Sequence, residues 1–340
     1  MAPPVYLAPT PQARRRYLCP HTRRGLGSGL VLDGRLDKPF WQDVPWTDLF
    51  VDIEGDARPR PTWATRAKLA YDATYLYVGA ELEEPHPWAI LTKHDEIVYY
   101  DHDFEVFLSP TGDNHRYYEL EINALSTVFD LFIEKPYRDG GPADHDFDFA
   151  GLKKAVHLDG PINDPARSAP PGRGWSVELA IAFESLDRHG EAPAGRAPRP
   201  GDRWRLNFSR VQWDLEVHEG AWRKIPGRAE HNWVWSPQGI IDMHRPEMWG
   251  DLEFLPPGTR ASDAKFVPEP WRGADDALHR VYYAQRGYQH RHGRWAATLV
   301  ELGLTEPGVN LQPDGDGWQA TAESPAGRLV MTSDSRIVKI

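Results

Sequence analysis

Two adjacent segments of the chain carry carboxylates at alternate positions. Segments 101–108 and 116–123 both alternate apolar with polar residues, which is the period of a half-buried β-strand. Residues 109–115 between them are dense in turn formers, so the two segments form a predicted hairpin. One face of this hairpin carries the carboxylates of Asp103, Glu105, Glu119 and Glu121. Because like charges across a strand pair repel, this acidic face requires cations, a bound ion or a polyhydroxylated ligand.

The register that we expect for this hairpin pairs Val106 with Tyr118, so that Phe104 faces Leu120. Neighbouring strands would supply cations to this face. In those strands Arg66, Lys68 and Arg205 occupy the alternate positions that carry polar side chains. A ladder of paired charges across one sheet face is one interpretation of this pattern. The other is that part of the face lines a glycan-binding site.

The acidic face also suggests acid–base chemistry. Glycosidases use two carboxyl groups about 5–10 Å apart whose pKa values are separated. Opposed strand residues could meet that distance, which makes Glu105, Glu119 and Glu121 the catalytic candidates. No feature of the sequence marks one of them as buried among apolar side chains. A carbohydrate-active enzyme is therefore the alternative hypothesis.

A second acidic stretch, residues 144–148, contains three aspartates that could supply oxygen ligands to calcium: Asp144, Asp146 and Asp148. The stretch lacks the glycine and the terminal glutamate of an EF-hand loop, so a solvated acidic loop is the competing interpretation. The histidines have no HExxH-type spacing, and we expect none of them to bind zinc.

Aromatic residues are the other unusual feature, since the chain has 14 Trp and only 4 Met. Tryptophan packs its flat face against sugar rings as well as in cores. Segments 230–239 and 242–252 combine tryptophan with amide, imidazole and guanidinium groups, as sugar recognition requires. The predicted ligand contacts are Trp88, Tyr100, Arg116, Asn232, Trp233, Trp235 and His244. The alternative role for Trp235 and Trp249 is to fill the edge of the fold as buried side chains.

The overall composition limits the kinds of partner that the chain is expected to bind. The net charge is −11 from 39 basic and 50 acidic residues, which argues against a nucleic-acid ligand. The single cysteine, Cys19, excludes an intramolecular disulfide. No window approaches about 18 consecutive apolar residues, so no membrane span is expected. The N-terminus lacks the apolar core of a secretory signal, which predicts a cytoplasmic protein, or an extracytoplasmic one if a leader is missing.

The elements that must position these residues are short strands separated by polar turns. This spacing predicts an all-β fold, a β-sandwich of two antiparallel sheets. We expect an extended N-terminal arm over residues 1–30 and the sandwich over 31–256. Residues 257–340 then form a small α+β extension, with helical spacing over 275–304 followed by short strands. This extension is too small for a strong core of its own, so it should dock on the sandwich.

Five pieces of sequence, taken in order, resemble carbohydrate-binding module family 9. They are Leu32-Asp33-Gly34 with Phe40-Trp41, then 75–78, then 103–108, then Gly174-Trp175-Ser176-Val177-Glu178, and finally Pro246 to Gly250. Their order and spacing cover about residues 31–256. The tail is similar to the extension of longer family-9-like proteins.

The resemblance implies a sandwich with structural calcium that binds cellulose, xylan or soluble sugars. In the family a sugar lies between two tryptophans, with an arginine on a nearby strand. The first tryptophan corresponds to Tyr100, the arginine to about Glu121, and the second tryptophan falls near Met243, flanked by Trp235 and Trp249. We therefore expect a carbohydrate-binding protein with an oligosaccharide or polysaccharide ligand and a role in carbohydrate catabolism. A protein partner could bind the C-terminal extension.

Overall fold

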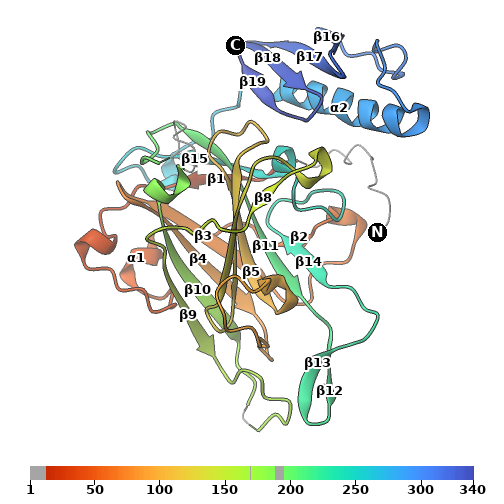
Figure 1. Cartoon of the computed structure of the whole chain (residues 1–340). Coiled ribbons are helices and arrows are strands. Elements are labelled where there is room, and N and C mark those ends of the chain that lie inside the picture. Colours follow the sequence, from red (N-terminus) through yellow and green to blue (C-terminus); the bar gives the residue numbers. More distant parts are fainter. Residues whose placement is uncertain (1–12, 169, 188–194) are drawn as a thin grey trace.

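The computed structural model describes residues 13–168, 170–187 and 195–340. Two β-sheets pack face to face, and a smaller unit built from the C-terminal residues lies at one end of them (Figure 1). The prediction of an all-β sandwich with an α+β extension is confirmed. Among the described residues, no helix is long and apolar enough to cross a membrane.

The larger sheet has the strand order β1-β15-β11-β5-β6-β7-β8, and β14 connects β11 to β2. Its strands are β1 (Arg16–Cys19), β2 (Val51–Asp52), β5 (Asp103–Ser109), β6 (Tyr117–Asn123), β7 (Val128–Ile133), β8 (Ala143–Asp144), β11 (Arg203–Gln212), β14 (His231–Val234) and β15 (Gly250–Phe254). The second sheet has the order β3-β4-β10-β9, from β3 (Thr65–Tyr71), β4 (Tyr75–Glu83), β9 (Lys153–Asp159) and β10 (Gly174–Ala182). A separate hairpin, β12 (Leu215–His218) and β13 (Ala221–Lys224), extends from the sandwich (Figure 1).

Short helical turns join these strands. They are α1 (Pro39–Gln42), η1 (Leu26–Ser28), η2 (Gly55–Ala57), η3 (Val98–Tyr100), η4 (Tyr137–Asp139), η5 (Phe183–Leu186), η6 (Pro246–Met248) and η7 (Ala261–Asp263). The core lies between the two sheets. It is built from the alternate apolar positions of strands such as β5, β6 and β10, which are completely buried.

The hairpin of β5 and β6 forms where the sequence predicts it, but the predicted register is wrong. Val106 pairs with Leu120 and Leu108 with Tyr118, so the pairing is shifted by two residues from the expected one. A shift of two residues leaves every side chain on its expected face, and the hydrophobic pattern therefore cannot detect it. The turn decides the register, and in it Asn114 and Arg116 adopt positive φ angles of 71° and 52°.

The N-terminal residues belong to the sandwich, so the predicted arm over residues 1–30 is too long. β1 pairs in parallel with β15 along Arg16–Cys19, and its Tyr17 and Cys19 lie in the core. Residues 1–12 of the predicted arm lie outside the described part of the chain. The alternation of these few residues is too short to mark a strand, and the pairing depends on a partner more than 230 positions away.

A buried glutamate joins two of the five pieces of sequence that carried the family resemblance. Glu178 on β10 accepts hydrogen bonds from the backbone N–H groups of Asp33 and Gly34, both at 2.9 Å, and from the indole of Trp41 at 2.7 Å. The ammonium of Lys38 also lies 2.7 Å from this carboxylate. Gly34 has a φ of +82°, and a Cβ there would lie 2.3 Å from the backbone nitrogen of His157. The turn therefore requires glycine, and Glu178 fixes it to the sheet.

The C-terminal unit consists of one helix, α2 (Arg272–His292), packed on a four-stranded sheet: β16 (Val309–Asp314), β17 (Gly317–Ser324), β18 (Gly327–Thr332) and β19 (Ile337–Lys339). Contrary to expectation, this unit has its own apolar core, which includes Leu278, Tyr282, Trp318 and Met331. The helix is shorter than the predicted 275–304 because Gly293, with a φ of +69°, caps it and donates its N–H to Gln289.

The unit docks on the sandwich mainly through buried polar contacts. Arg14 pairs with Asp275 at 2.8 Å, Arg138 pairs with Glu247 at 2.9 Å beside Tyr283, and Asn114 lies 2.9 Å from the ring of His279. Ion pairs of this kind fix a geometry even where they add little net stability.

Candidate functional site

The acidic face of β5 and β6 is buried. The exposed fractions of Asp103, Glu105, Glu119 and Glu121 are 0, 5, 5 and 2%. Glu105 and Glu121 lie directly opposite each other in the ladder. One carboxylate oxygen each from Asp103, Glu105 and Glu121 falls within 4.8 Å of the other two. The four side chains thus form a convergent group, which we call the acidic cluster.

The cations that the sequence predicted for this cluster are elsewhere, so that prediction is wrong. Arg66 pairs with Glu81 on the outer face of the smaller sheet, and Lys68 donates to the backbone of Trp41. Arg205 pairs with Asp251 and with Asp275 of α2. Strand parity does not say to which sheet a strand belongs, which explains the error for Arg66 and Lys68 on the smaller sheet. Arg205 lies on the same sheet as the cluster, but it is opposite Ser109, at the far end of β5 from Asp103.

Burial changes the acidity of the cluster. Desolvation raises the pKa of Glu105 to about 7, and it raises the pKa of Asp103 well above its usual range, with the charge of Glu105 adding to the effect. For Glu119 and Glu121, burial and then the charge of Glu105 likewise raise the pKa well above the ordinary value. The face is therefore electrostatically strained unless protons or a cation are bound.

Aromatic side chains and one loop cover the cluster. The backbone N–H of Tyr99 in η3 donates a 2.8 Å hydrogen bond to Glu121. His244 lies 3.9 Å from Glu119, and its ring contacts the half-exposed Tyr137 at 4.4 Å between centroids. Burial lowers the pKa of His244 to about 4, so it is neutral at pH 7 and does not compensate the carboxylates.

A second group of aromatic residues begins where η3 ends. The ring of Tyr100 is 49% exposed and lies 4.7 Å from that of Tyr99. The ammonium of Lys224, at the end of β13, lies 3.5 Å from the ring centroid of Trp213, 5.0 Å from that of Tyr100 and 6.0 Å from that of Trp88. We call Trp88, Tyr99, Tyr100 and Trp213, with Lys224 among them, the aromatic cluster.

One hydrogen bond joins two members of the aromatic cluster, and a second connects the cluster to the sandwich. The indole N–H of Trp213 donates to the backbone oxygen of Tyr99 at 2.9 Å, and the ring of His102 lies 3.0 Å from the backbone oxygen of Trp213. His102 in turn is hydrogen-bonded to the buried Glu84. Its ring also packs against Trp88 at 5.4 Å. The cluster thus rests on a fixed base while Tyr100 presents a face to solvent.

Polar groups lie beside this aromatic face. Glu230 interacts electrostatically with both Tyr99 and Lys224, and the partly exposed Asn232 occupies β14 opposite Val211. Burial lowers the pKa of Lys224, with the charges of Asp101 and Glu230 opposing this shift. An aromatic face with a carboxylate and an ammonium beside it suits a polyhydroxylated ligand.

The remaining predicted ligand residues are not in this region or are not accessible. Trp235 is completely buried in the core, and Trp233 is 4% exposed beneath His231 and Arg210. Arg116 lies in the β5–β6 turn and pairs with Asp113 near the C-terminal unit. The complete burial of Trp235 and Trp249 agrees with their alternative role of filling the edge of the fold. Trp88 belongs to the aromatic cluster, but only 4% of it is exposed.

The predicted calcium ligands separate in the structure. Asp148 joins His94, Asp95 and Asp130, whose ligand atoms lie within 4.8 Å of one another, whereas Asp144 and Asp146 lie outside this group. His94 is 2.6 Å from Asp148, and this hydrogen bond raises the pKa of the imidazole. The protonated ring therefore offsets part of the negative charge of this group. Calcium at this loop stays a prediction.

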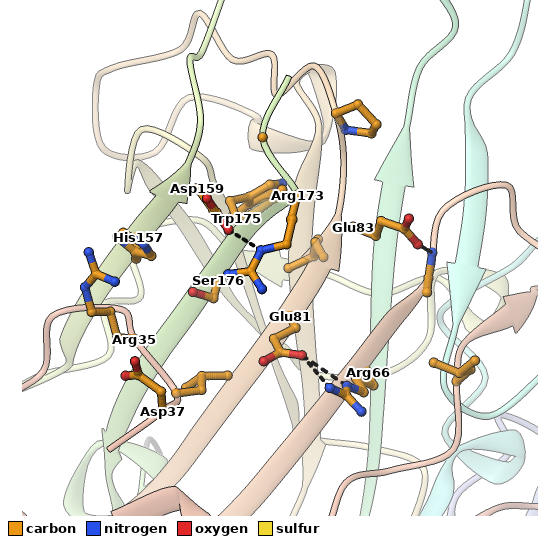
Figure 2. Close-up of a pocket in the computed structure, with 17 residues that line it drawn as sticks. Arg35, Asp37, Arg66, Glu81, Glu83, His157, Asp159, Arg173, Trp175 and Ser176 are labelled. Atoms are coloured by element: carbon orange, nitrogen blue, oxygen red, sulfur yellow. Dashed lines mark hydrogen bonds and ion pairs between the residues drawn. The ribbon is translucent and has the colours of Figure 1, made fainter. Parts of the chain in front are cut away.

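A groove on the outer face of the smaller sheet is a separate cavity of about 690 Å³ (Figure 2). Figure 2 shows two ion pairs in it, Arg66 with Glu81 and Arg173 with Asp159 at 2.5 Å, and it draws Arg35 and Asp37 without a dashed line. Trp175 lies at its wall but is 3% exposed, and the ring of Trp46 nearby is covered by Arg66 at 3.9 Å. Among its described residues, the groove therefore offers charged side chains but no free aromatic face.

Sequence reasoning missed Trp213, Lys224, Tyr99 and Glu230. Trp213 ends a predicted strand and looked like part of it, and Lys224 lies in a short charged hairpin with no periodic pattern. The aromatic-rich composition was the one signal that could have drawn attention to them.

Comparison with known proteins agrees with this architecture. Residues 32–132, from the turn held by Glu178 to the end of β7, match the family model described as Carbohydrate family 9 binding domain-like. The resemblance predicted from the sequence is confirmed over this stretch of the chain. Comparison with curated proteins gives no match.

Three solved structures are similar at low sequence identity. A protein from Bacteroides uniformis ATCC 8492, proposed to bind carbohydrate, is 17% identical, with a TM-score of 0.48 over 71% of this chain and 100% of its own. A carbohydrate-binding module family 9 from Caldicellulosiruptor kristjanssonii is 16% identical in complexes with cellotriose and with glucose. Each complex covers 75% of this chain and 100% of its own, with a TM-score of 0.44. At these values the likeness says nothing about the ligand of this chain.

Proposed function

We propose that this protein binds a soluble or plant-type oligosaccharide at the aromatic cluster, with Tyr100 as the stacking face. The observation that supports this most directly is the half-exposed ring of Tyr100, held beside Lys224 and Trp213 on a rigid base. The family model matched by residues 32–132 supports a sugar as the ligand.

Each part of the site has a separate role in this proposal. Tyr100 packs against the apolar face of one sugar ring, as aromatic side chains do with pyranoses. Lys224 donates and Glu230 accepts hydrogen bonds at the edge of that ring, and Asn232 provides both a donor and an acceptor farther along β14. The hairpin of β12 and β13 positions the ammonium, so its sequence would select among sugars.

Calorimetry with cello-, xylo- and manno-oligosaccharides tests the proposal. Tyr100→Ala should weaken binding about tenfold, because one stacking contact is worth about 1.4 kcal/mol. Arg173→Ala is the matched control in the groove of Figure 2, since the Arg173 side chain is 94% exposed and far from η3 in the chain. Affinity that survives Tyr100→Ala and is lost in Arg173→Ala would move the site to the groove. No binding across the panel by the folded protein would reject the proposal.

Hydrolysis remains the second candidate function, supported by the proximity of Glu105 and Glu121 and by the raised pKa of Glu105. It predicts product release from some oligosaccharide and loss of that release in Glu105→Gln. Binding without turnover across the same sugar panel would exclude it for those substrates.

A further inference from the structure

A buried histidine lies at the base of the aromatic cluster. His102 is 1% exposed, and both nitrogens of its ring face hydrogen-bond acceptors. Nδ1 is hydrogen-bonded to the carboxylate of Glu84, and Nε2 lies 3.0 Å from the backbone oxygen of Trp213. A backbone oxygen and an ionised carboxylate can only accept hydrogen bonds. A neutral imidazole has one N–H and satisfies one of these two acceptors, whereas an imidazolium satisfies both.

The groups around Glu84 keep its carboxylate ionised. The indole N–H of Trp175 donates to it at 2.8 Å, the amide of Gln212 donates at 3.2 Å, and the guanidinium of Arg210 lies 3.4 Å away. Burial of Glu84 opposes its ionisation, but the charges of His102 and Arg210 outweigh burial and lower its pKa. Each of these partners is a donor, so a proton on the carboxylate would have no acceptor among them.

The amide of Gln212 does not substitute for a proton on the ring. Its oxygen accepts two hydrogen bonds from Arg210, at 2.6 and 3.0 Å, which directs its nitrogen towards Glu84 and the ring of His102. This nitrogen lies 3.2 Å from each of the two ring nitrogens. An atom equally far from both lies in the plane that bisects the ring, and on the lone-pair axis of neither nitrogen. The hydrogen bond to the oxygen of Trp213 therefore requires a proton on Nε2.

Three other charged groups belong to segments that pack near His102. The carboxylates of Asp101 and Asp103, its neighbours in the chain, accept backbone N–H groups of other segments. The ammonium of Lys224 lies 6.0 Å from the ring of Trp88, which itself packs edge-on against His102 at 5.4 Å. Among the described residues, the charged group that hydrogen-bonds the ring is therefore the buried glutamate.

We propose that His102 is a positioning residue of the aromatic cluster and acts as an imidazolium, with one N–H bound by Glu84 and the other by the backbone oxygen of Trp213. The indole of Trp213 in turn donates to the backbone of Tyr99, the residue before the half-exposed Tyr100. One ring proton thus connects a buried ion pair to the face at which the sugar stacks. This inference rests on the proposed function, because it specifies how pH regulates that same site.

The direction of the pH effect follows from the two hydrogen bonds of the ring. When the pH rises, the ring releases one proton to water. The remaining proton stays on Nδ1, because a hydrogen bond to an ionised carboxylate is stronger than one to a backbone oxygen. The lone pair of Nε2 then faces the oxygen of Trp213, which loses its donor. A hydrogen bond is worth about three- to tenfold in an equilibrium constant, so sugar affinity should fall by this factor as His102 loses its proton.

Long-range ¹H–¹⁵N spectra of the full chain, labelled with ¹⁵N-histidine, test the protonation state without any sugar. The signals of His102 are identified by their absence from His102→Gln. At pH 5.5 both of its ring nitrogens should carry a proton. On titration to pH 9 the indole N–H signal of Trp213, assigned with Trp213→Phe, should shift in step with the ring of His102. A neutral His102 ring at pH 5.5, or a Trp213 signal that does not follow His102, would overturn the proposal.

Calorimetry with the same sugar panel, from pH 5.5 to pH 9, tests the effect on binding. The native affinity should fall in step with the loss of the His102 proton. Glu84→Gln should flatten this profile, because the new amide donates to Nδ1 of a neutral ring whose Nε2–H still reaches the Trp213 oxygen. Lys224, whose pKa is lowered by burial, is present in both proteins and therefore cannot account for a difference between the two profiles.

An exposed histidine supplies the matched control. His145→Gln changes a ring in the loop after β8 and should keep the native pH profile. A Glu84→Gln profile that matches the native one, or a native affinity that stays constant while His102 titrates, would overturn the proposal. Absence of binding across the panel would reject the proposed function instead, and the spectra of the native protein would still decide whether His102 is an imidazolium coupled to Trp213.

Discussion

Glu178 accepts a 2.7 Å hydrogen bond from the indole of Trp41 across 137 positions of the chain. The same carboxylate holds the Asp33-Gly34 turn and the ammonium of Lys38. Replacing it removes the common acceptor of several donors at once. Two of the five pieces of sequence that resemble family 9 are therefore connected physically, through one buried side chain.

Glu178→Ala should lower the free energy of unfolding by about 3–5 kcal/mol, because it leaves buried donors and a cation without their acceptor. Chemical denaturation measures this loss. Glu81→Gln on the adjacent strand is the control, and its exposed pair with Arg66 should be worth no more than about 1 kcal/mol. Equal effects of the two changes would contradict the central role of Glu178.

Trp235 should behave as a core residue and not as a ligand contact. A Cβ at Gly250 would lie 2.3 Å from the Trp235 ring, so Gly250→Ala should cost about 1–3 kcal/mol of stability. In the Trp235→Phe background this penalty should fall, because the smaller ring leaves space for the methyl group. A double-mutant cycle by chemical denaturation measures the coupling. Additive penalties would show that the two residues do not touch in solution.

The docking of α2 should weaken at alkaline pH. Burial alone would lower the pKa of His279, but the charge and hydrogen bond of Asp275 outweigh it and raise the pKa; Glu247 adds in the same direction. This stabilisation is therefore complete below the ordinary histidine pKa of about 6.5 and is lost as the pH rises through the higher folded value. Denaturation of the native protein and of His279→Gln at pH 5.5 and pH 9 should show a smaller difference at pH 9. A difference in stability between the native protein and His279→Gln that grows with pH would show that protonated His279 does not stabilise the docking of α2.

Acid should weaken the same interface through Glu247. Its burial opposes ionisation, but the charges of Arg138, His279 and Arg245 hold its pKa at about 2. The stabilisation is complete above the ordinary glutamate pKa of about 4.3 and disappears as the pH falls towards 2. Glu247→Gln should therefore be destabilised relative to the native protein at pH 6 and nearly equal to it at pH 2, by denaturant titration. The exposed control Glu323→Gln should not show this convergence.

The sequence predicted the faces of the strands well because alternation is a local property. Phe104 and Leu120 are buried in the core and Glu105 and Glu121 lie on the opposite face, as expected. The register of that hairpin was wrong because a shift of two residues preserves the alternation.

The candidate site was harder to predict, since it depends on contacts between distant segments. Tyr100 was identified and is exposed, although its role as a ligand contact stays a prediction. Trp235 was misplaced because its surroundings in the sequence do not say which way the ring points. Lys224 contacts Trp213 because it lies at the end of the β12–β13 hairpin. The sequence of this hairpin has no periodic pattern of apolar residues that would predict it. The counter-ions assigned to the acidic face were also wrong. Arg66 and Lys68 belong to the other sheet, and Arg205 pairs with Asp251 and with Asp275 of α2.

The parallel pairing of β1 with β15 also has a consequence for the order of folding. Tyr17 and Cys19 complete the core, yet their partner strand ends at Phe254, and Arg14 finds Asp275 later still. During synthesis these N-terminal residues must wait, unpaired, until three quarters of the chain has left the ribosome. Contacts of such sequence separation slow folding. The nascent protein would therefore expose its first strand for most of its synthesis, when a chaperone has the longest opportunity to bind it.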